Sequence, residues 1–239
     1  MDPTPDAFRA LARSSPWRFR TLHLTHRDAG HAVEAWLRRP GDLLVRDGDR
    51  LVRTQGPPQS VSGFRLDTGT GRVVPLDDPS PLWPQDVDPP LRPDGLVAER
   101  PDGPDYGDPM HQNYRWVASL DPVELSHHVQ VRGLEAGLRA GRPTWTAEVV
   151  PEEGYDPRCG CCPLLFSAVS ECDETAGSGY PPWHVRNPVG RYPDAYRVGL
   201  DVATGVVVSL HPVGGAGLPR LDLEIDIHAV DADLNALFG

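Results

Sequence analysis

The segment Thr144-Trp-Thr-Ala-Glu-Val-Val-Pro151, which continues through Tyr155-Asp-Pro-Arg-Cys-Gly-Cys-Cys-Pro-Leu-Leu165, is the part of the chain around which the other elements are arranged. Apolar and polar residues alternate from Thr144 to Val149, and this period of two predicts a β-strand. A corner rich in proline and glycine follows, and it holds three of the four cysteines. The apolar run Pro163-Leu-Leu-Phe166 after the corner is predicted to be a second strand.

The length of the chain fits one large all-β domain or two small ones, and the composition indicates many turns. The chain has 239 residues, of which 39% are hydrophobic, and it contains 27 Pro and 24 Gly. A chain of this length buries roughly 70–75% of the surface that its unfolded form exposes, so it forms a core without needing disulfides or metal. We therefore predict a single β-rich domain over residues 1–239.

The charge distribution argues against nucleic acid as a partner. The chain carries 23 basic and 34 acidic residues, a net charge of −11, and every basic residue is Arg. The arginines are scattered along the sequence and form no basic patch of the kind that a phosphate backbone requires.

The N-terminus gives an expectation about location. The opening Met1-Asp-Pro-Thr-Pro-Asp6 has neither the basic segment nor the apolar run of a secretory signal. No stretch approaches the ~18 apolar residues that span a bilayer, so no transmembrane segment is predicted. We expect a cytoplasmic protein, whose thiols stay reduced and do not form a disulfide framework.

The first residues predict a helix that leads into strands. Apolar residues at helical spacing predict a short amphipathic helix over residues 6–13, which Pro16 would end. Alternation with a period of two starts at Trp17 and slips by one residue, which predicts a strand with a bulge near Thr21. The residues 33–38 predict the next strand.

Two hairpins follow. The Asp47-Gly48 turn lies inside Leu43 to Arg53 and supplies the positive φ angles of a tight hairpin. Phe64 to Asp67 and Arg72 to Pro75 predict another. These strands follow one another without a helix between them, so we predict an antiparallel meander.

The segment from Pro75 to Pro109 differs in composition from the rest. It contains 10 Pro in 35 residues and carries a net charge of −7. Such a segment continues neither a helix nor a central strand. We predict a long crossing loop held at Leu82, Trp83 and Leu96, and a flexible acidic linker between domains is the competing interpretation.

The second half predicts one more helix and the remaining strands. Asp121-Pro-Val-Glu124 has the signals of a helix start, with the helix continuing to Val129. Further predicted elements are a turn over residues 137–142, strands over 196–202, 206–210 and 221–227, and a closing helix after Asp231. The predicted fold class is mainly β (α+β), with an antiparallel sheet and a few short helices.

The order of elements resembles that of the LolA/RseB-like family, remotely. The resemblance rests on the leading helix and meander, on Leu120-Asp-Pro-Val-Glu-Leu125, on the Gly-Arg-x-x-Trp strand from Gly141 to Trp145, and on the hairpin from Leu200 to Gly205. This family includes a lipoprotein carrier and a sigma-factor regulator. The resemblance implies a strongly curved antiparallel half-barrel, partly covered by helices, whose apolar concave face takes acyl chains or lipoproteins.

The cysteine corner is the main candidate for chemistry. Cys159 and Cys162 have the C-x-x-C spacing with which two thiolates reach one Zn²⁺. Cys172 is the predicted third ligand, with His184 or Cys161 as the fourth. Two other interpretations stay open, namely small buried apolar side chains and a disulfide or redox pair.

Other polar residues predict no catalytic centre. The sequence has no G-x-S-x-G motif, so we predict that the protein is not an enzyme. His127 and His128 are adjacent and predict exposed side chains rather than a metal site. Asp222, Glu224 and Asp226 are spaced two apart, which predicts a solvated outer face of a strand.

The predicted function is binding without catalysis. Trp17, Phe19 and Trp145 lie in apolar phases of predicted strands and are the candidate ligand-binding residues, although core packing explains them as well. The ligand is expected to be an apolar, lipid-like small molecule or a protein partner held on the concave face of the sheet. The alternative is an interaction or regulatory protein stabilised by zinc, and no other cofactor is expected.

Overall fold

The computed structural model describes residues 3–54, 64–67, 72–75, 82–171 and 181–238. Its helices include α1 (Pro5–Arg18), α2 (Tyr114–Leu120), α4 (Trp183–Arg186) and α5 (Asn235–Phe238), with 3₁₀ turns η1 (Pro84–Asp86) and η2 (Val123–Leu125). Its strands are β1 (Thr21–Asp28), β2 (His31–Arg38), β3 (Asp42–Asp47), β4 (Arg50–Thr54), β5 (Phe64–Asp67), β6 (Arg72–Pro75), β7 (Val129–Arg139), β8 (Arg142–Pro151), β9 (Ala195–Asp201), β10 (Val207–Val213) and β11 (Leu223–Val230). No helix in these ranges is long and apolar enough to cross a membrane.

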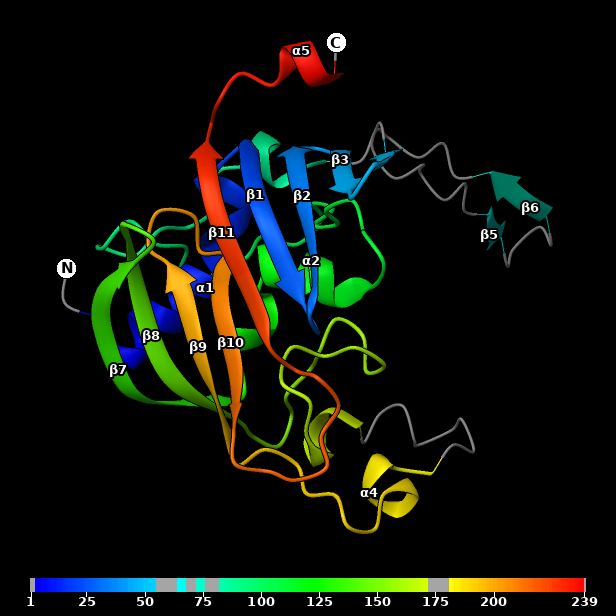
Figure 1. Cartoon of the computed structure of the whole chain (residues 1–239). Helices are drawn as coiled ribbons and strands as arrows, with labels where there is room; N and C mark the ends of the chain where they lie inside the picture. Colours follow the sequence, from blue (N-terminus) through cyan, green and yellow to red (C-terminus); the bar gives the residue numbers. More distant parts are fainter. Residues whose placement is uncertain (1–2, 55–63, 68–71, 76–81, 172–180, 239) are drawn as a thin grey trace.

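Nine of the described strands form one open antiparallel sheet in the order β4-β3-β2-β1-β11-β10-β9-β8-β7 (Figure 1). β1 and β11, the first and last strands, pair in its middle. β5 and β6 pair with each other in a separate two-stranded sheet. The predicted mainly β class with a curved, half-barrel sheet is confirmed, as are the strands over 33–38, 196–202, 206–210 and 221–227 and both hairpins.

Alternation gives the sheet one apolar and one polar face. Leu22 and Leu24 of β1 are fully buried. On β11, Leu223 is fully buried and Ile225 is 1% exposed. α1 and α2 lie on one side of the sheet (Figure 1), and their buried residues share one core cluster with these four side chains. Each fully buried Leu or Ile contributes about 1.5–3 kcal/mol relative to an exposed one, so this packing holds the layers together.

The first helix is longer than predicted, because Pro16 does not end it. Thr4 caps its start by accepting the N–H of Ala7 at 3.1 Å, and the helix continues to Arg18. Proline in the last turn removes one backbone donor, but tertiary donors satisfy nearby carbonyls. Arg39 donates to the Ser15 carbonyl and Gln85 to the Pro16 carbonyl, each at 2.8 Å.

Several other predicted elements are wrong. Trp17 belongs to α1 instead of a strand, and the bulge lies between His23 and Leu24, where β1 pairs with β11. The helix expected from Asp121 to Val129 is the single 3₁₀ turn η2, because the Asp121 carboxylate binds two arginines instead of capping a helix. The strand β7 begins at Val129 and was not predicted.

Residues 82–109 run along α1 and contain little regular structure. Val97 donates its N–H to Ser14 Oγ and accepts from Arg13 Nε, each at 2.8 Å. Trp17 Nε1 donates to the Val87 carbonyl at 3.0 Å. This segment is therefore ordered by hydrogen bonds to α1 and not by a helix or strand of its own.

The predicted contacts of this loop are correct in part. Leu96 is 4% exposed and belongs to the core, whereas Leu82 is 54% exposed, so its prediction was wrong. Trp83 is half-buried. Residues 76–81 lie outside the described part of the chain.

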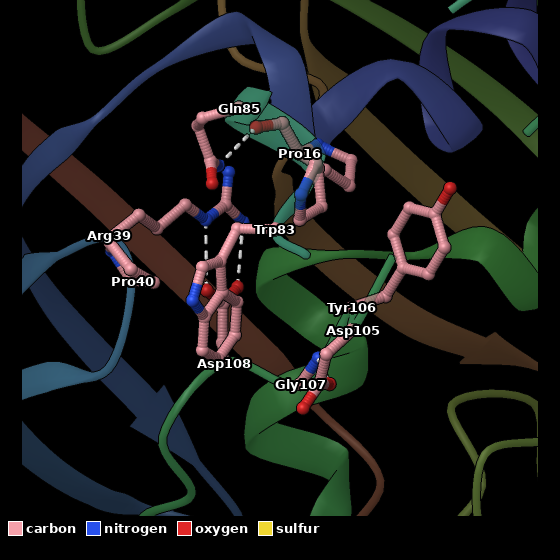
Figure 2. Close-up of a pocket in the computed structure, with 10 residues that line it drawn as sticks. Pro16, Arg39, Pro40, Trp83, Gln85, Asp105, Tyr106, Gly107 and Asp108 are labelled. Atoms are coloured by element: carbon pink, nitrogen blue, oxygen red, sulfur yellow. Dashed lines mark hydrogen bonds and ion pairs between the residues drawn. The ribbon is translucent and has the colours of Figure 1, made fainter. Parts of the chain in front are cut away.

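The end of the loop is fixed by a buried ion pair (Figure 2). Arg39 donates Nε and Nη2 to the two carboxylate oxygens of Asp108, at 2.8 and 2.6 Å. The Arg39 guanidinium also lies 3.8 Å from the ring centroid of Phe19. This arrangement joins β2, the end of α1 and the crossing loop.

We expect Arg39→Met to lower the free energy of unfolding by about 3 kcal/mol or more, since it leaves Asp108 buried without its counter-charge. The two side chains are 4% and 7% exposed. The matched control is Arg197→Met in the surface pair with Glu135, whose side chains are 54% and 69% exposed. The control should change stability by less than about 0.5 kcal/mol. Equal effects of the two variants in urea unfolding would contradict this assignment.

A buried histidine makes stability depend on pH. His26 of β1 is 5% exposed and packs against Trp116 of α2, with ring centroids 4.5 Å apart. Burial, with smaller contributions from the charges of Arg115 and His111, lowers its pKa from 6.5 to about 3. Between these pH values the unfolded chain binds a proton at His26 that the folded chain does not, so acid favours unfolding.

We expect the free energy of unfolding to fall with decreasing pH by about 1.4 kcal/mol per unit more in the wild-type protein than in His26→Gln, starting near 6.5. The measurement is urea unfolding of both proteins at several pH values between 7 and 4. His228→Gln, at an exposed position of β11, is the control and should keep the wild-type slope. Parallel curves for wild type and His26→Gln would contradict the proposed linkage.

Candidate functional site

The three predicted ligand-binding residues occupy different environments. Trp17 is half-buried near the end of α1. Phe19 is 2% exposed and is covered on one face by Arg39. Trp145 of β8 is 4% exposed and belongs to the main core cluster. Trp17 and Phe19 line the same hollow, whereas Trp145 packs in the interior.

Two hollows adjoin at Trp17 and Arg18. The first has a volume of about 410 Å³ and is lined by Trp17, Arg18, Phe19, Arg20, Thr21, Gln85, Val87, Asp88 and Asp231. The second has a volume of about 380 Å³ and is lined by Ser14, Trp17, Arg18, Pro89, Leu91, Gly95, Val97 and Ala203. We call the two together the Trp17 groove. It lies between the end of α1 and the crossing loop.

The groove combines an apolar wall with a charged rim. Trp17, Val87 and Leu91 supply the apolar surface, and Leu91 is 61% exposed. Arg18 is held by the carbonyls of Ala203 and Val202 at 2.8 and 2.9 Å. Arg20 is exposed on the rim. Such a combination suits a molecule with an apolar body and a polar end.

A third hollow, drawn in Figure 2, is too small for a ligand. It lies beside the Arg39–Asp108 pair and is lined by Trp83 and Tyr106 among others, but its volume is about 10 Å³. That is about the space of one water molecule. The apolar inner face of the sheet is likewise packed beneath α1 and α2, so the larger openings lie at the edge of this packing.

The cysteine corner is a tight turn that gathers three thiols. The N–H of Cys162 donates to the Cys159 carbonyl at 3.2 Å, which closes a four-residue turn. The Sγ atoms of Cys159, Cys161 and Cys162 all lie within 4.8 Å of one another. Cys161 is exposed, and the other two are half-buried.

The expected ligand set is only partly assembled in the described residues. Cys159 and Cys162 come together as predicted, and Cys161 joins them. Cys172 lies outside the described residues. His184 Nδ1 lies 3.4 Å from the Tyr192 hydroxyl instead of joining the thiols. The apolar run 163–166 does not form the predicted strand, and residues 168–171 after it are helical.

Glu124 fixes both ends of the cysteine corner. Its carboxylate accepts the Tyr155 hydroxyl at 2.6 Å, the Arg158 N–H at 3.0 Å and the Leu164 N–H at 2.8 Å. The Tyr155 hydroxyl in turn accepts the N–H of Leu165 at 3.2 Å. A side chain that the sequence marked as a helix signal therefore shapes a loop 40 residues away.

Buried charged groups lie around the Glu124 carboxylate. Burial raises the pKa of Glu124, against the effect of its three donors. Burial also acts to raise the pKa of Asp121, but the guanidinium groups of Arg100 and Arg158 outweigh it, so that the pKa is lowered. No local pattern marked this network, because its members are brought together by the crossing loop and the corner.

Two of the three thiols in the corner have raised pKa values. A hydrogen bond with Cys159, followed by partial burial, raises the pKa of Cys161 to about 12. Burial is the main cause that raises the pKa of Cys162, although the backbone N–H of Arg115 opposes it. Cys161 and Cys162 are therefore protonated thiols at neutral pH, unlike the thiolates of redox enzymes.

Two further predictions are confirmed. His127 and His128 are both exposed. Glu224 and Asp226 lie on the outer, polar face of β11, where both pair with Arg139 at 3.3 and 3.7 Å. Ion pairs across the outer face explain this acidic stripe.

We expect Glu124→Gln to destabilise the protein by about 2 kcal/mol, because an amide cannot accept all three hydrogen bonds and leaves buried donors unsatisfied. Hydrogen exchange should accelerate at the amides of Arg158 and Leu164. Glu153→Gln, an exposed position in the same segment, is the control and should leave both properties unchanged. Unchanged protection of these two amides in Glu124→Gln would show that the carboxylate does not hold the corner.

Comparison with known proteins concerns the fold. No protein-family model matches the sequence, and no curated protein is similar to it. The solved structures similar to this chain include MucB, with 13% identity and a TM-score of 0.32, over 95% of this chain and 60% of MucB. They also include LprF from Mycobacterium bovis, with 10% identity and a TM-score of 0.33, over 98% of this chain and 97% of LprF. At TM-scores of 0.32 and 0.33 these similarities are remote, and we draw no conclusion about this chain from them.

Proposed function

We propose that the protein binds an apolar, lipid-like molecule in the Trp17 groove without catalysing a reaction. The observation that carries this proposal is the pair of adjoining hollows of about 410 and 380 Å³ that share Trp17 and Arg18. Each has the size of a typical small-molecule site, 300–1,000 Å³. The sequence contains no recognised catalytic motif, which is consistent with binding alone.

The chemistry of the walls supports a chain-like ligand with a polar end. The indole of Trp17 and the side chains of Val87 and Leu91 would contact the apolar part. Arg20 on the rim would attract an anionic end group, and Asp88 and Asp231 would select against a second negative charge. The concave face itself contributes indirectly, since its buried side chains position α1. A protein partner that presents an apolar side chain is the alternative occupant.

The test uses 11-(dansylamino)undecanoic acid, a fluorescent fatty acid. We expect saturable binding to the full chain and at least about tenfold weaker binding by Leu91→Glu, which corresponds to about 1.4 kcal/mol. Trp17→Ala should weaken binding as well. The matched control is Leu138→Glu, because Leu138 is 75% exposed on β7 and does not line the groove.

The outcomes separate the alternatives. Absence of saturable binding, or equal loss in Leu91→Glu and Leu138→Glu, would refute a lipid-like ligand in this groove. Far-UV circular dichroism of each variant checks that the fold is retained. Leu91→Glu is more informative than Trp17→Ala, because Leu91 is exposed and a charge at that position should not disturb the core.

A further inference from the structure

The thiol cluster is separate from the Trp17 groove and has the geometry of a ligand set. It consists of Cys159, Cys161 and Cys162, whose Sγ atoms lie within 4.8 Å of one another. The sulfur atoms of Cys161 and Cys162 are 3.7 Å apart. A disulfide would require about 2.05 Å, so these are separate thiols.

The separation of the sulfurs suits a shared metal ion. Two thiolates at about 2.3 Å from one tetrahedral Zn²⁺ lie about 3.8 Å from each other. The turn closed by Cys162 N–H and the Cys159 carbonyl brings the first and last cysteines of the C-x-x-C together. Cys161 lies between them in sequence and adds a third sulfur on the exposed side.

The corner is held in place without a metal. The carboxylate of Glu124 binds the backbone before and after the cysteines, at Arg158 and Leu164. The side chain of Arg158 also pairs with Asp121. The ligands are therefore positioned before binding, which reduces the conformational entropy lost when a metal binds.

We propose that Cys159, Cys161 and Cys162 bind one Zn²⁺ ion as three thiolates. Binding replaces the three thiol protons, which pass to solvent, and a water molecule completes the tetrahedron. Cys161 thus takes the place that the sequence assigned to Cys172. Cu⁺ prefers the same soft ligands, and the experiment distinguishes the two ions.

The test uses the full chain, reduced and freed of metal, and titrates it with Zn²⁺ in competition with a chromophoric chelator, and separately with Cu⁺. We expect one Zn²⁺ per chain, bound tightly enough to compete with the chelator. Cys161→Ser should weaken Zn²⁺ binding by about 100-fold or more, since loss of even an outer-sphere partner of a metal site costs 10–100-fold. Cys172→Ser is the matched control and should bind as the wild type does.

Zinc X-ray absorption of the wild type counts sulfur neighbours and does not depend on a variant that folds. Three sulfurs and one oxygen support the proposal. Failure to bind Zn²⁺, whether or not Cu⁺ binds, unaltered binding by Cys161→Ser, or strong loss in Cys172→Ser would each overturn it. Fatty-acid binding at the Trp17 groove is a separate measurement and does not affect this result.

Discussion

Burial of the inner face of the sheet is the constraint on which the rest of the structure depends. The sheet is open, so its apolar side chains need a cover, and α1 with α2 supplies it (Figure 1). Phe8 and Leu11 of α1 are fully buried against the sheet. Because a helix can cover only part of a nine-stranded surface, the irregular segments must cover the remainder. The position of the crossing loop and of the cysteine corner follows from this requirement.

The crossing loop shows how a segment with few apolar residues becomes ordered. Its backbone exchanges hydrogen bonds with α1 near Ser14, and Arg39 binds Asp108 at its end. These contacts are polar and directional, so they fix the loop without filling every space beside it. The Trp17 groove is the space that remains between loop and helix. Its apolar wall is therefore a consequence of how the loop is attached.

The cysteine corner depends on buried charge in a similar way. Glu124 and Asp121 are both buried and both bind groups of the corner or the crossing loop. A buried carboxylate is stable only when several donors compensate the loss of water. Satisfying that requirement brings Tyr155, Arg158 and Leu164 to defined positions. The thiols between them are consequently presented on a rigid turn at the surface.

The sequence by itself determined the class of the fold and most of the strands, because alternation with a period of two and tight turns are local signals. Gly48, at a φ of 57°, is one such signal. The sequence alone also predicted that Cys159 and Cys162 come together, since that contact lies within four residues. Only the tertiary structure decided that Trp145 is core while Trp17 borders a groove, that β7 forms an edge of the sheet, and that Glu124 clamps the corner. Those outcomes depend on contacts between residues far apart in the chain, and the energy that decides them, burial of charge and apolar surface, has no counterpart in a local pattern.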